Sequence, residues 1–266
     1  MESRNPAFRG NNFGQQAGGY GAPTPQQLQD MYNAPSYAPP AERAMTIDDV
    51  VVRGFLTLVT LVATAALSWV LVPAKLALPV LAVAIIAQLG IWAFITFGRN
   101  KANAGTVIAF AAIYGVAVGI ISNAYNDLYH GVVFQAVIGT ALAFGATLAV
   151  YALRIVRVTP KFTKFVLAAG IGLIGLMLVN LVVQIFGSDS GIGIRDASNP
   201  LAYVFSVVAI LVGCFFLLLD FDAVEQGVRA QAPEKFAWYC AFGLVLSLVW
   251  IYLELLRFLS YFYGRD

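Results

Sequence analysis

The sequence is poor in charged residues, and this scarcity limits the classes of protein that it can encode. Only 11% of its 266 residues are Asp, Glu, Lys or Arg, whereas 60% are hydrophobic. A soluble domain carries about 25% charged residues on its water-facing surface. The net charge of +2 is also too small for the basic face of a nucleic-acid-binding protein. The composition therefore indicates an integral membrane protein whose surroundings are a lipid bilayer.

Residues that build metal sites and hydrolytic active sites are scarce as well. The chain has two cysteines, Cys214 and Cys240, both in apolar stretches, and one histidine, His130. Two such cysteines form neither a disulfide framework nor a zinc pattern. A single histidine does not suffice for a His-based metal site, and a Ser-His-Asp hydrolase lacks its other residues beside it. We therefore predict no enzyme activity, no metal and no cofactor.

The first 48 residues differ from the rest of the chain. They hold six of the eleven prolines, many Gly, Gln and Asn residues, and no long apolar run. Such a segment cannot bury enough apolar surface to offset the entropy lost on ordering. It is not a signal peptide either, because no apolar stretch follows Arg4 and Arg9. We predict a disordered tail over residues 1–48, with a protein-binding role as the alternative to a simply solvated segment.

Seven apolar runs follow, each about 19–24 residues long. At 1.5 Å per residue, about 20 helical residues cross a hydrocarbon core of about 30 Å. None of the runs alternates like a strand, and barrel strands need only about ten residues. We therefore predict an all-α polytopic membrane protein with seven transmembrane helices in residues 49–266. The runs are 51–72, 76–97, 104–122, 132–152, 163–186, 201–221 and 237–260.

The distribution of Lys and Arg between the loops predicts the orientation. Only Lys75 and Arg195 fall in the loops on one side of the membrane. Because cytoplasmic loops carry the excess of Lys and Arg, the N-terminus is expected in the cytoplasm. The membrane itself is expected to be the inner membrane of a bacterium. The opposite side holds twelve: Arg4, Arg9, Arg43, Arg53, Arg99, Lys101, Arg154, Arg157, Lys161, Lys164, Arg229 and Lys235.

Carboxylates within or beside the last two runs are the main functional candidates. A charge at the centre of a membrane helix costs about 2.5–3.5 kcal/mol on insertion scales, so such residues are functional candidates by default. Asp220 and Asp222 end the sixth run, and its helix is expected to continue to about residue 230. If the antiparallel turn lies between Glu234 and Lys235, Ser247 on the seventh helix is level with Asp222.

A third carboxylate, Glu254, lies seven residues beyond Ser247, about 10.5 Å along the helix and on the same face. Arg257 follows three residues later and can pair with it. We therefore treat Asp220, Asp222, Ser247 and Glu254 as candidate ion- or proton-sensing residues. The alternative is structural: Glu254 and Arg257 form an ion pair, and the two aspartates lie at the interface.

Other polar and small residues inside the runs carry weaker signals. Asn180 and Gln184 are spaced to share a helix face and can line a polar path, but they can equally form hydrogen bonds between helices. Small residues at helical spacing allow close helix packing. The glycines expected to do so are Gly115, Gly119, Gly170, Gly172 and Gly175.

Several stretches together resemble the Bax inhibitor-1 family, in particular its bacterial YccA-like branch. The resemblance covers about residues 50–262 and leaves out the tail. It rests on the seven spans, the expected cytoplasmic N-terminus and five local matches. These are LLDFDAVEQ (218–226), WYC (238–240), YLELLR (252–257), GTALAF (139–144) and AAIYGVAVG (111–119).

The resemblance implies a seven-helix fold with the last helix in the centre, and a pH-sensitive calcium leak governed by two aspartates. The first of these matches Asp222 in the Phe-Asp-Ala sequence, but the second falls on Ser247. A serine cannot share a proton with a carboxylate as a second acid does. The paired-acid sensor is thus incomplete here, and Glu254 is the remaining candidate for the second acid.

Two functions follow as expectations. The first is a cation leak for Ca²⁺, modulated by protonation of Asp222 with help from Glu254. Hard cations prefer oxygen ligands, and a change of charge can shift a two-state equilibrium. The second is a non-transporting regulator that binds a membrane protease or another stress-response partner through the tail. An intramembrane aspartic enzyme is disfavoured, because Ser247 stands where a second acid would be needed.

Overall fold

The computed structural model describes residues 43–98, 102–187, 192–196 and 198–263, together with residues 25, 26 and 29. The helices discussed below all belong to the unit Glu42–Asp266. The prediction of a disordered tail concerns residues that lie almost entirely outside this description. Residues 43–48, which the sequence assigned to the tail, are structured. The helix Ile47–Leu71 begins among them, and the backbone of Met45 is hydrogen-bonded to Ala232.

Within the described residues the chain forms seven helices that are long and apolar enough to cross a membrane. This confirms the predicted all-α architecture and the number of spans. The sixth predicted helix ends at Arg229, close to the expected position. The helices are α2 (Ile47–Leu71), α3 (Ala74–Phe97), α4 (Ala104–Leu128), α5 (Val132–Ala152), α6 (Pro160–Phe186), α7 (Pro200–Arg229) and α8 (Phe236–Tyr263).

Local sequence signals fix where several helices begin. A capping side chain accepts a hydrogen bond from a backbone N–H group of the first turn, which otherwise has no partner in the helix. In α6 and α7 a proline follows the cap, at a position where its missing N–H group costs nothing. The caps are Thr46 for α2, Asn103 for α4, Thr159 for α6 and Asn199 for α7.

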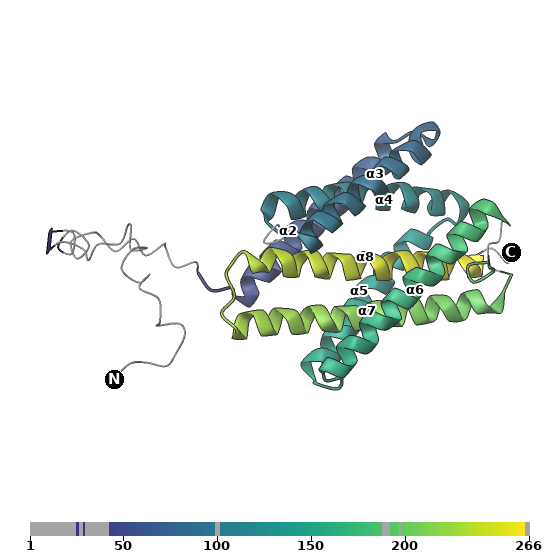
Figure 1. Cartoon of the computed structure of the whole chain (residues 1–266). Helices are drawn as coiled ribbons and strands as arrows, with labels where there is room; N and C mark the ends of the chain where they lie inside the picture. Colours follow the sequence, from purple (N-terminus) through teal and green to yellow (C-terminus); the bar gives the residue numbers. More distant parts are fainter. Residues whose placement is uncertain are drawn as a thin grey trace, which may run out of the picture. The chain divides into compact units, whose positions relative to one another are not determined.

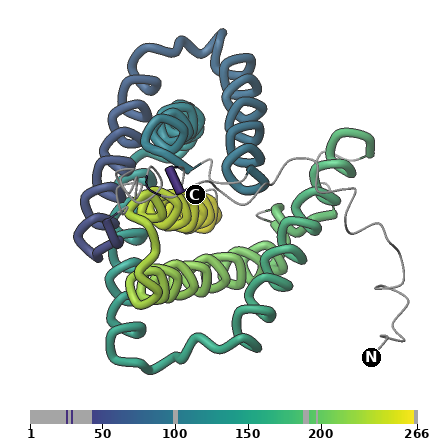
Figure 2. The backbone as a smooth tube through the Cα atoms, turned by 60° about the vertical axis from the view of Figure 1, so that its left-hand side comes forward, coloured from purple at the N-terminus to yellow at the C-terminus, as the bar shows by residue number. Residues whose placement is uncertain are grey.

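Helix α8 is the central helix of the bundle. It packs against α2, α4, α5 and α7, whereas α3 packs on α4 and α6 packs on α7. Figure 1 shows α8 running alongside α7, and Figure 2 shows α8 surrounded by the other helices. The fold therefore has the central last helix that the family resemblance implied. It also places polar side chains between α7 and α8 in the interior of the bundle.

Candidate functional site

The hairpin of α7 and α8 brings Asp220 and Ser247 into contact. The hydroxyl of Ser247 donates a hydrogen bond to the carboxylate of Asp220. A Cβ atom built on Gly243, one turn before Ser247, would lie 2.7 Å from Oδ1 of Asp220. The missing side chain at Gly243 thus leaves space for the carboxylate, and Ser247 supplies its hydrogen bond. We call Asp220, Gly243 and Ser247 the hairpin site.

The partner of Ser247 is therefore Asp220, and the prediction that Asp222 lies opposite Ser247 is wrong. The prediction placed the turn between Glu234 and Lys235. The turn instead lies between Arg229 and Phe236, so its centre comes earlier in the chain. In an antiparallel hairpin, moving the centre by one residue changes the level partner by two. The contact between Asp220 and Ser247 corresponds to a centre one residue earlier than predicted, which replaces Asp222 by Asp220.

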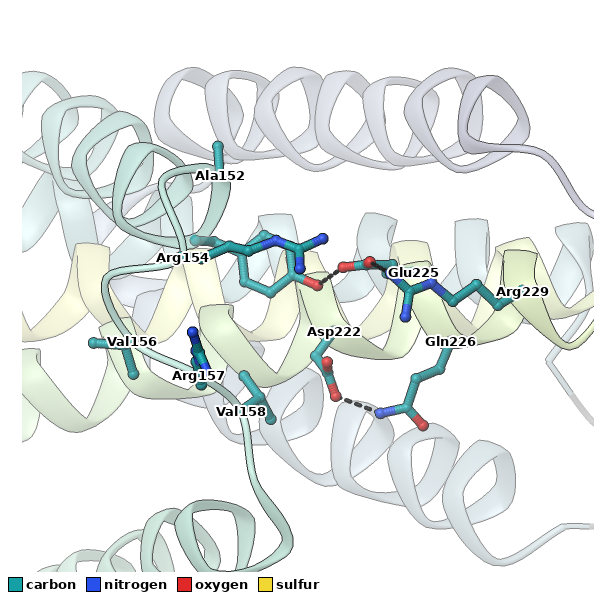
Figure 3. A pocket seen from close by; sticks show the side chains of 10 residues that line it. Ala152, Arg154, Val156, Arg157, Val158, Asp222, Glu225, Gln226 and Arg229 are labelled. Atoms are coloured by element: carbon teal, nitrogen blue, oxygen red, sulfur yellow. Dashed lines mark hydrogen bonds and ion pairs between the residues drawn. The ribbon is translucent and has the colours of Figure 1, made fainter.

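Asp222 instead lines a pocket at the end of α7, next to the loop between α5 and α6 (Figure 3). Its carboxylate accepts a hydrogen bond from the side-chain amide of Gln226. Glu225, on the same stretch of α7, accepts hydrogen bonds from the hydroxyl of Tyr151 and from Arg229. We call this concavity the loop pocket; its volume is about 290 Å³. It is lined by Tyr151, Ala152, Arg154, Val156, Arg157, Val158, Asp222, Glu225, Gln226 and Arg229.

Glu254 is buried near the other end of α8, and its partner comes from a loop. Only 6% of Glu254 is exposed, and its carboxylate forms an ion pair of 2.6 Å with Arg195. The sequence suggested Arg257 as the partner. Arg257 instead donates to the hydroxyl of Tyr261 at 3.1 Å and to the backbone carbonyl of Arg195 at 3.2 Å. The ion pair thus fixes the loop between α6 and α7 to the central helix.

Further contacts hold the same loop in place. The side-chain oxygen of Asn180, a buried residue of α6, accepts a hydrogen bond from the backbone of Ile192 at 3.1 Å. Within the loop, the backbone N–H and the hydroxyl of Ser198 donate to Asp196, and they lower the pKa of that carboxyl below its ordinary value. Asn180 is therefore a tether for the loop. Gln184 is an exposed residue of α6.

The N-terminal end of the described chain is attached to the turn between α7 and α8. Arg43–Thr46, which we call the strap, pairs with the turn through two backbone hydrogen bonds. The N–H of Met45 donates to Ala232 at 2.8 Å, and the N–H of Glu234 donates to Arg43 at 2.9 Å. The side chain of Met45 is only 1% exposed. The strap therefore forms part of the packed domain.

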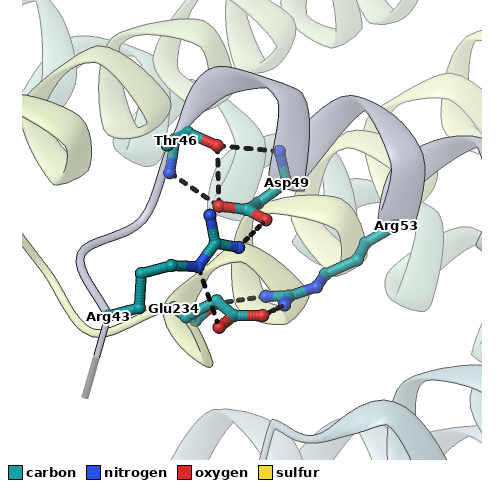
Figure 4. A network of polar contacts seen from close by, with 5 residues as sticks. All are labelled: Arg43, Thr46, Asp49, Arg53 and Glu234. Carbon is teal, nitrogen blue, oxygen red and sulfur yellow. Dashed lines mark hydrogen bonds and ion pairs between the residues drawn. The ribbon is translucent and has the colours of Figure 1, made fainter.

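Charged side chains reinforce the strap (Figure 4). Arg53 on α2 forms an ion pair with Glu234, and its guanidinium lies 5.4 Å from the ring centre of Trp238. Arg43 pairs with Asp49 at 2.6 Å and with Glu234 at 3.4 Å. The start of α2 and the turn of the hairpin are thus linked by one network of charges.

Sequence reasoning missed two residues that the structure places at these sites. Arg195 was counted only as a loop charge, although it is one of two cations assigned to its side of the membrane. No local pattern marks its pairing, because Glu254 lies 59 residues further along the chain. Gly243 carried no signal either, because only the hairpin geometry shows that it faces Asp220.

Comparison with models of protein families identifies the family of this chain. A family model described as Bax inhibitor 1 like matches residues 5–264, and this match includes most of the tail as well as all seven helices. A search of curated proteins found no match. Since the family match covers nearly the whole chain, the protein belongs to the Bax inhibitor 1 like family of membrane proteins.

Proposed function

We propose that the protein is a pH-modulated cation leak, with Ca²⁺ as the cation and Asp220 as the group whose protonation controls it. The observation that supports this function is the contact of Asp220 with Ser247 and Gly243 between two helices of the bundle. The family match supports the same class of protein. The role that the sequence assigned to Asp222 is thereby moved to Asp220.

The physical basis is the cost of a charge in a surrounding of low polarity. A carboxylate among membrane helices is expensive unless hydrogen bonds, a cation or water compensate it. Among the described residues, the side-chain hydrogen bond that compensates Asp220 comes from the hydroxyl of Ser247. The thiol of Cys240 on α8 is a titratable group that interacts electrostatically with Asp220. Binding a proton removes the charge, so the protonated and ionised forms favour different packing of α7 against α8.

The two other carboxylates have different surroundings and therefore different proposed roles. Glu254 lies two turns of α8 beyond Ser247, about 10.5 Å along the helix, and its charge is neutralised by Arg195. This ion pair would close one end of the hairpin to ions. Asp222 lies outside the hairpin site, in the loop pocket, which faces the cytoplasm in the predicted orientation.

Asparagine at position 220 should abolish the pH dependence of ion flux. Asp220→Asn has nearly the same shape as the protonated acid but cannot ionise. We therefore expect its flux at every pH to equal the flux that the unmodified protein reaches at the acidic limit. The measurement is the release of Ca²⁺ from proteoliposomes between pH 5 and pH 8, with the full-length protein reconstituted at equal density.

Asp222→Asn serves as the matched control, because it removes the same chemical group two residues further along the same helix. This variant should keep the pH profile of the flux, because Asp222 lies in the loop pocket and not in the hairpin site. A flat profile for Asp222→Asn together with an unchanged one for Asp220→Asn would transfer the sensing role back to Asp222. If neither protein nor variant conducts Ca²⁺ at any pH, the leak itself is wrong.

A second function, regulation of a membrane protease or another stress-response partner, is favoured by the strap. Arg43 and Met45 bind the turn of the hairpin, and residues 1–42 precede them directly. A partner that captures the tail would therefore act on the chain next to the turn that joins α7 and α8.

Deleting residues 1–42 tests this second function. The deletion keeps the strap, so the helical domain should retain its thermal stability and any ion flux. Partner capture, measured by co-purification from bacterial membranes, should be lost. Unchanged capture would assign the partner contact to the membrane domain, and loss of flux would show that the tail is required for transport.

A further inference from the structure

The loop pocket is lined by three arginines and two carboxylates, so positive charge is in excess there. The acidic groups of the pocket are already engaged: Glu225 accepts from Tyr151 and Arg229, and Asp222 accepts from Gln226. Within the described part of the chain, the side chains of Arg154 and Arg157 form no hydrogen bond or ion pair, although the charge of Arg154 acts on the carboxylate of Glu225. Figure 3 shows the side chain of Arg154 extending from the loop toward Glu225, with Arg157 further along the loop.

The backbone of this loop adopts a conformation that is unusual for an arginine. Arg154 has a φ angle of 54°, in the left-handed region that non-glycine residues rarely occupy. The conformation belongs to the end of α5, where the N–H of Arg154 donates to the carbonyl of Tyr151 at 3.0 Å and the N–H of Ile155 donates to that of Val150 at 3.1 Å. The conformation ends α5 and directs the chain along the rim of the pocket, so that Arg154 and Arg157 both line it.

The neighbours of Arg154 place the pocket at the membrane surface. Leu153 is 72% exposed and Ile155 is 67% exposed, although both are large apolar residues. They lie where the apolar helix α5 ends, so their exposed side chains suit the boundary between acyl chains and headgroups. Arginines next to such residues are at the depth of lipid phosphates.

We propose that the loop pocket binds the phosphate group of an anionic lipid headgroup, with Arg154 and Arg157 as its ligands. Guanidinium groups donate paired hydrogen bonds to phosphate oxygens and keep their charge at all physiological pH values. The pocket volume of about 290 Å³ is many times the ~30 Å³ share of one water molecule, so a hydrated phosphate fits. This site is separate from the hairpin site and does not depend on ion conduction.

Lipid binding by purified full-length protein in a neutral detergent tests the proposal. The probes are dioctanoyl phosphatidylglycerol, dioctanoyl phosphatidylcholine and inorganic phosphate, with bound lipid measured by native mass spectrometry. The double variant Arg154→Gln/Arg157→Gln should bind phosphatidylglycerol at least about tenfold more weakly, because it removes the charged, paired hydrogen bonds to the phosphate oxygens. Glutamine at position 154 tolerates the left-handed backbone about as well as arginine does.

The control is Lys161→Gln/Lys164→Gln, which removes the same charge from the start of α6 without altering the lining of the pocket. It should weaken phosphatidylglycerol binding by less than about threefold. Equal losses in the two double variants would reduce the effect to general surface charge and overturn the proposal. Equal binding of phosphatidylcholine would also overturn it. Displacement of phosphatidylglycerol by inorganic phosphate at similar concentration would identify free phosphate, rather than lipid, as the occupant.

If the double variant does not fold, Arg157→Gln alone decides the question, since residue 157 lacks the unusual backbone of Arg154. The single variant should lose phosphatidylglycerol affinity while keeping the thermal stability of the unmodified protein. An unchanged affinity would remove Arg157 from the site and with it the paired recognition of phosphate.

Discussion

Replacing Gly115 and Gly119 together by alanine should lower the free energy of unfolding by about 2–6 kcal/mol, because overpacking costs about 1–3 kcal/mol at each position. Both glycines lie on the face of α4 that packs against α2. A Cβ atom at Gly115 would overlap the backbone carbonyl of Leu61, and one at Gly119 would overlap that of Ala65. A backbone carbonyl cannot rotate away as a side chain can, so the two helices would have to separate.

Separating these helices also disrupts a polar contact between them. The hydroxyl of Ser68 on α2 donates to the backbone carbonyl of Val116 at 3.2 Å. This bond requires the close approach that the two glycines allow. In a membrane, where lipid gives helices no hydrophobic reason to associate, such packing and hydrogen bonds are the main sources of association. The loss should therefore be visible as a lower thermal unfolding temperature in detergent.

The control is Gly172→Ala/Gly175→Ala in α6. A Cβ atom at either position meets no other atom within 4 Å. Alanine has the better helix propensity by about 1 kcal/mol per residue, so this variant should be as stable as the original or slightly more stable. Equal destabilisation of both pairs would mean that glycine flexibility, rather than the contact between α2 and α4, determines the result.

The seven helices could be predicted from the sequence because their signals are local. A long apolar run is sufficient to identify a membrane span, and the residues at its ends identify the caps. The expected close packing was confirmed at Gly115 and Gly119, and Gly170 faces the ring of Phe216. Gly172 and Gly175 meet no neighbour, so the expected close packing is absent there. The prediction failed at these two positions because glycine spacing alone does not reveal which face of a helix is covered.

The polar contacts were harder to predict because they depend on parts of the chain that are distant in sequence. The pairing of Ser247 depends on the position of the turn, and a displacement of one residue exchanged Asp222 for Asp220. The pairing of Glu254 with Arg195 joins residues 59 positions apart. Nearby Arg257 satisfied the helical spacing rule, but this rule cannot detect a loop that folds back onto α8.

Replacing Arg195 by alanine should lower the free energy of unfolding by about 3–5 kcal/mol, because it leaves the charge of Glu254 buried without a partner. Glu254 cannot turn to water, since it is 6% exposed on the central helix. Oε2 of Glu254 and Nε of Arg195 are buried without a hydrogen-bond partner among the described residues, so the direct ion pair is the main compensation for the carboxylate. The measurement is again thermal unfolding in detergent. The control is Arg229→Ala, which removes an exposed ion pair with Glu225 and should lower the free energy of unfolding by only about 0.3–0.5 kcal/mol.

A double substitution separates the loss of the ion pair from the loss of the loop contact. Arg195→Met/Glu254→Leu removes both charges and keeps most of the volume, and such replacements of buried pairs are often neutral or stabilising. It should therefore recover most of the stability lost in Arg195→Ala. If the double variant is as unstable as the single one, the loop is held by the hydrogen bond from Arg257 and by Asn180 rather than by the buried charge.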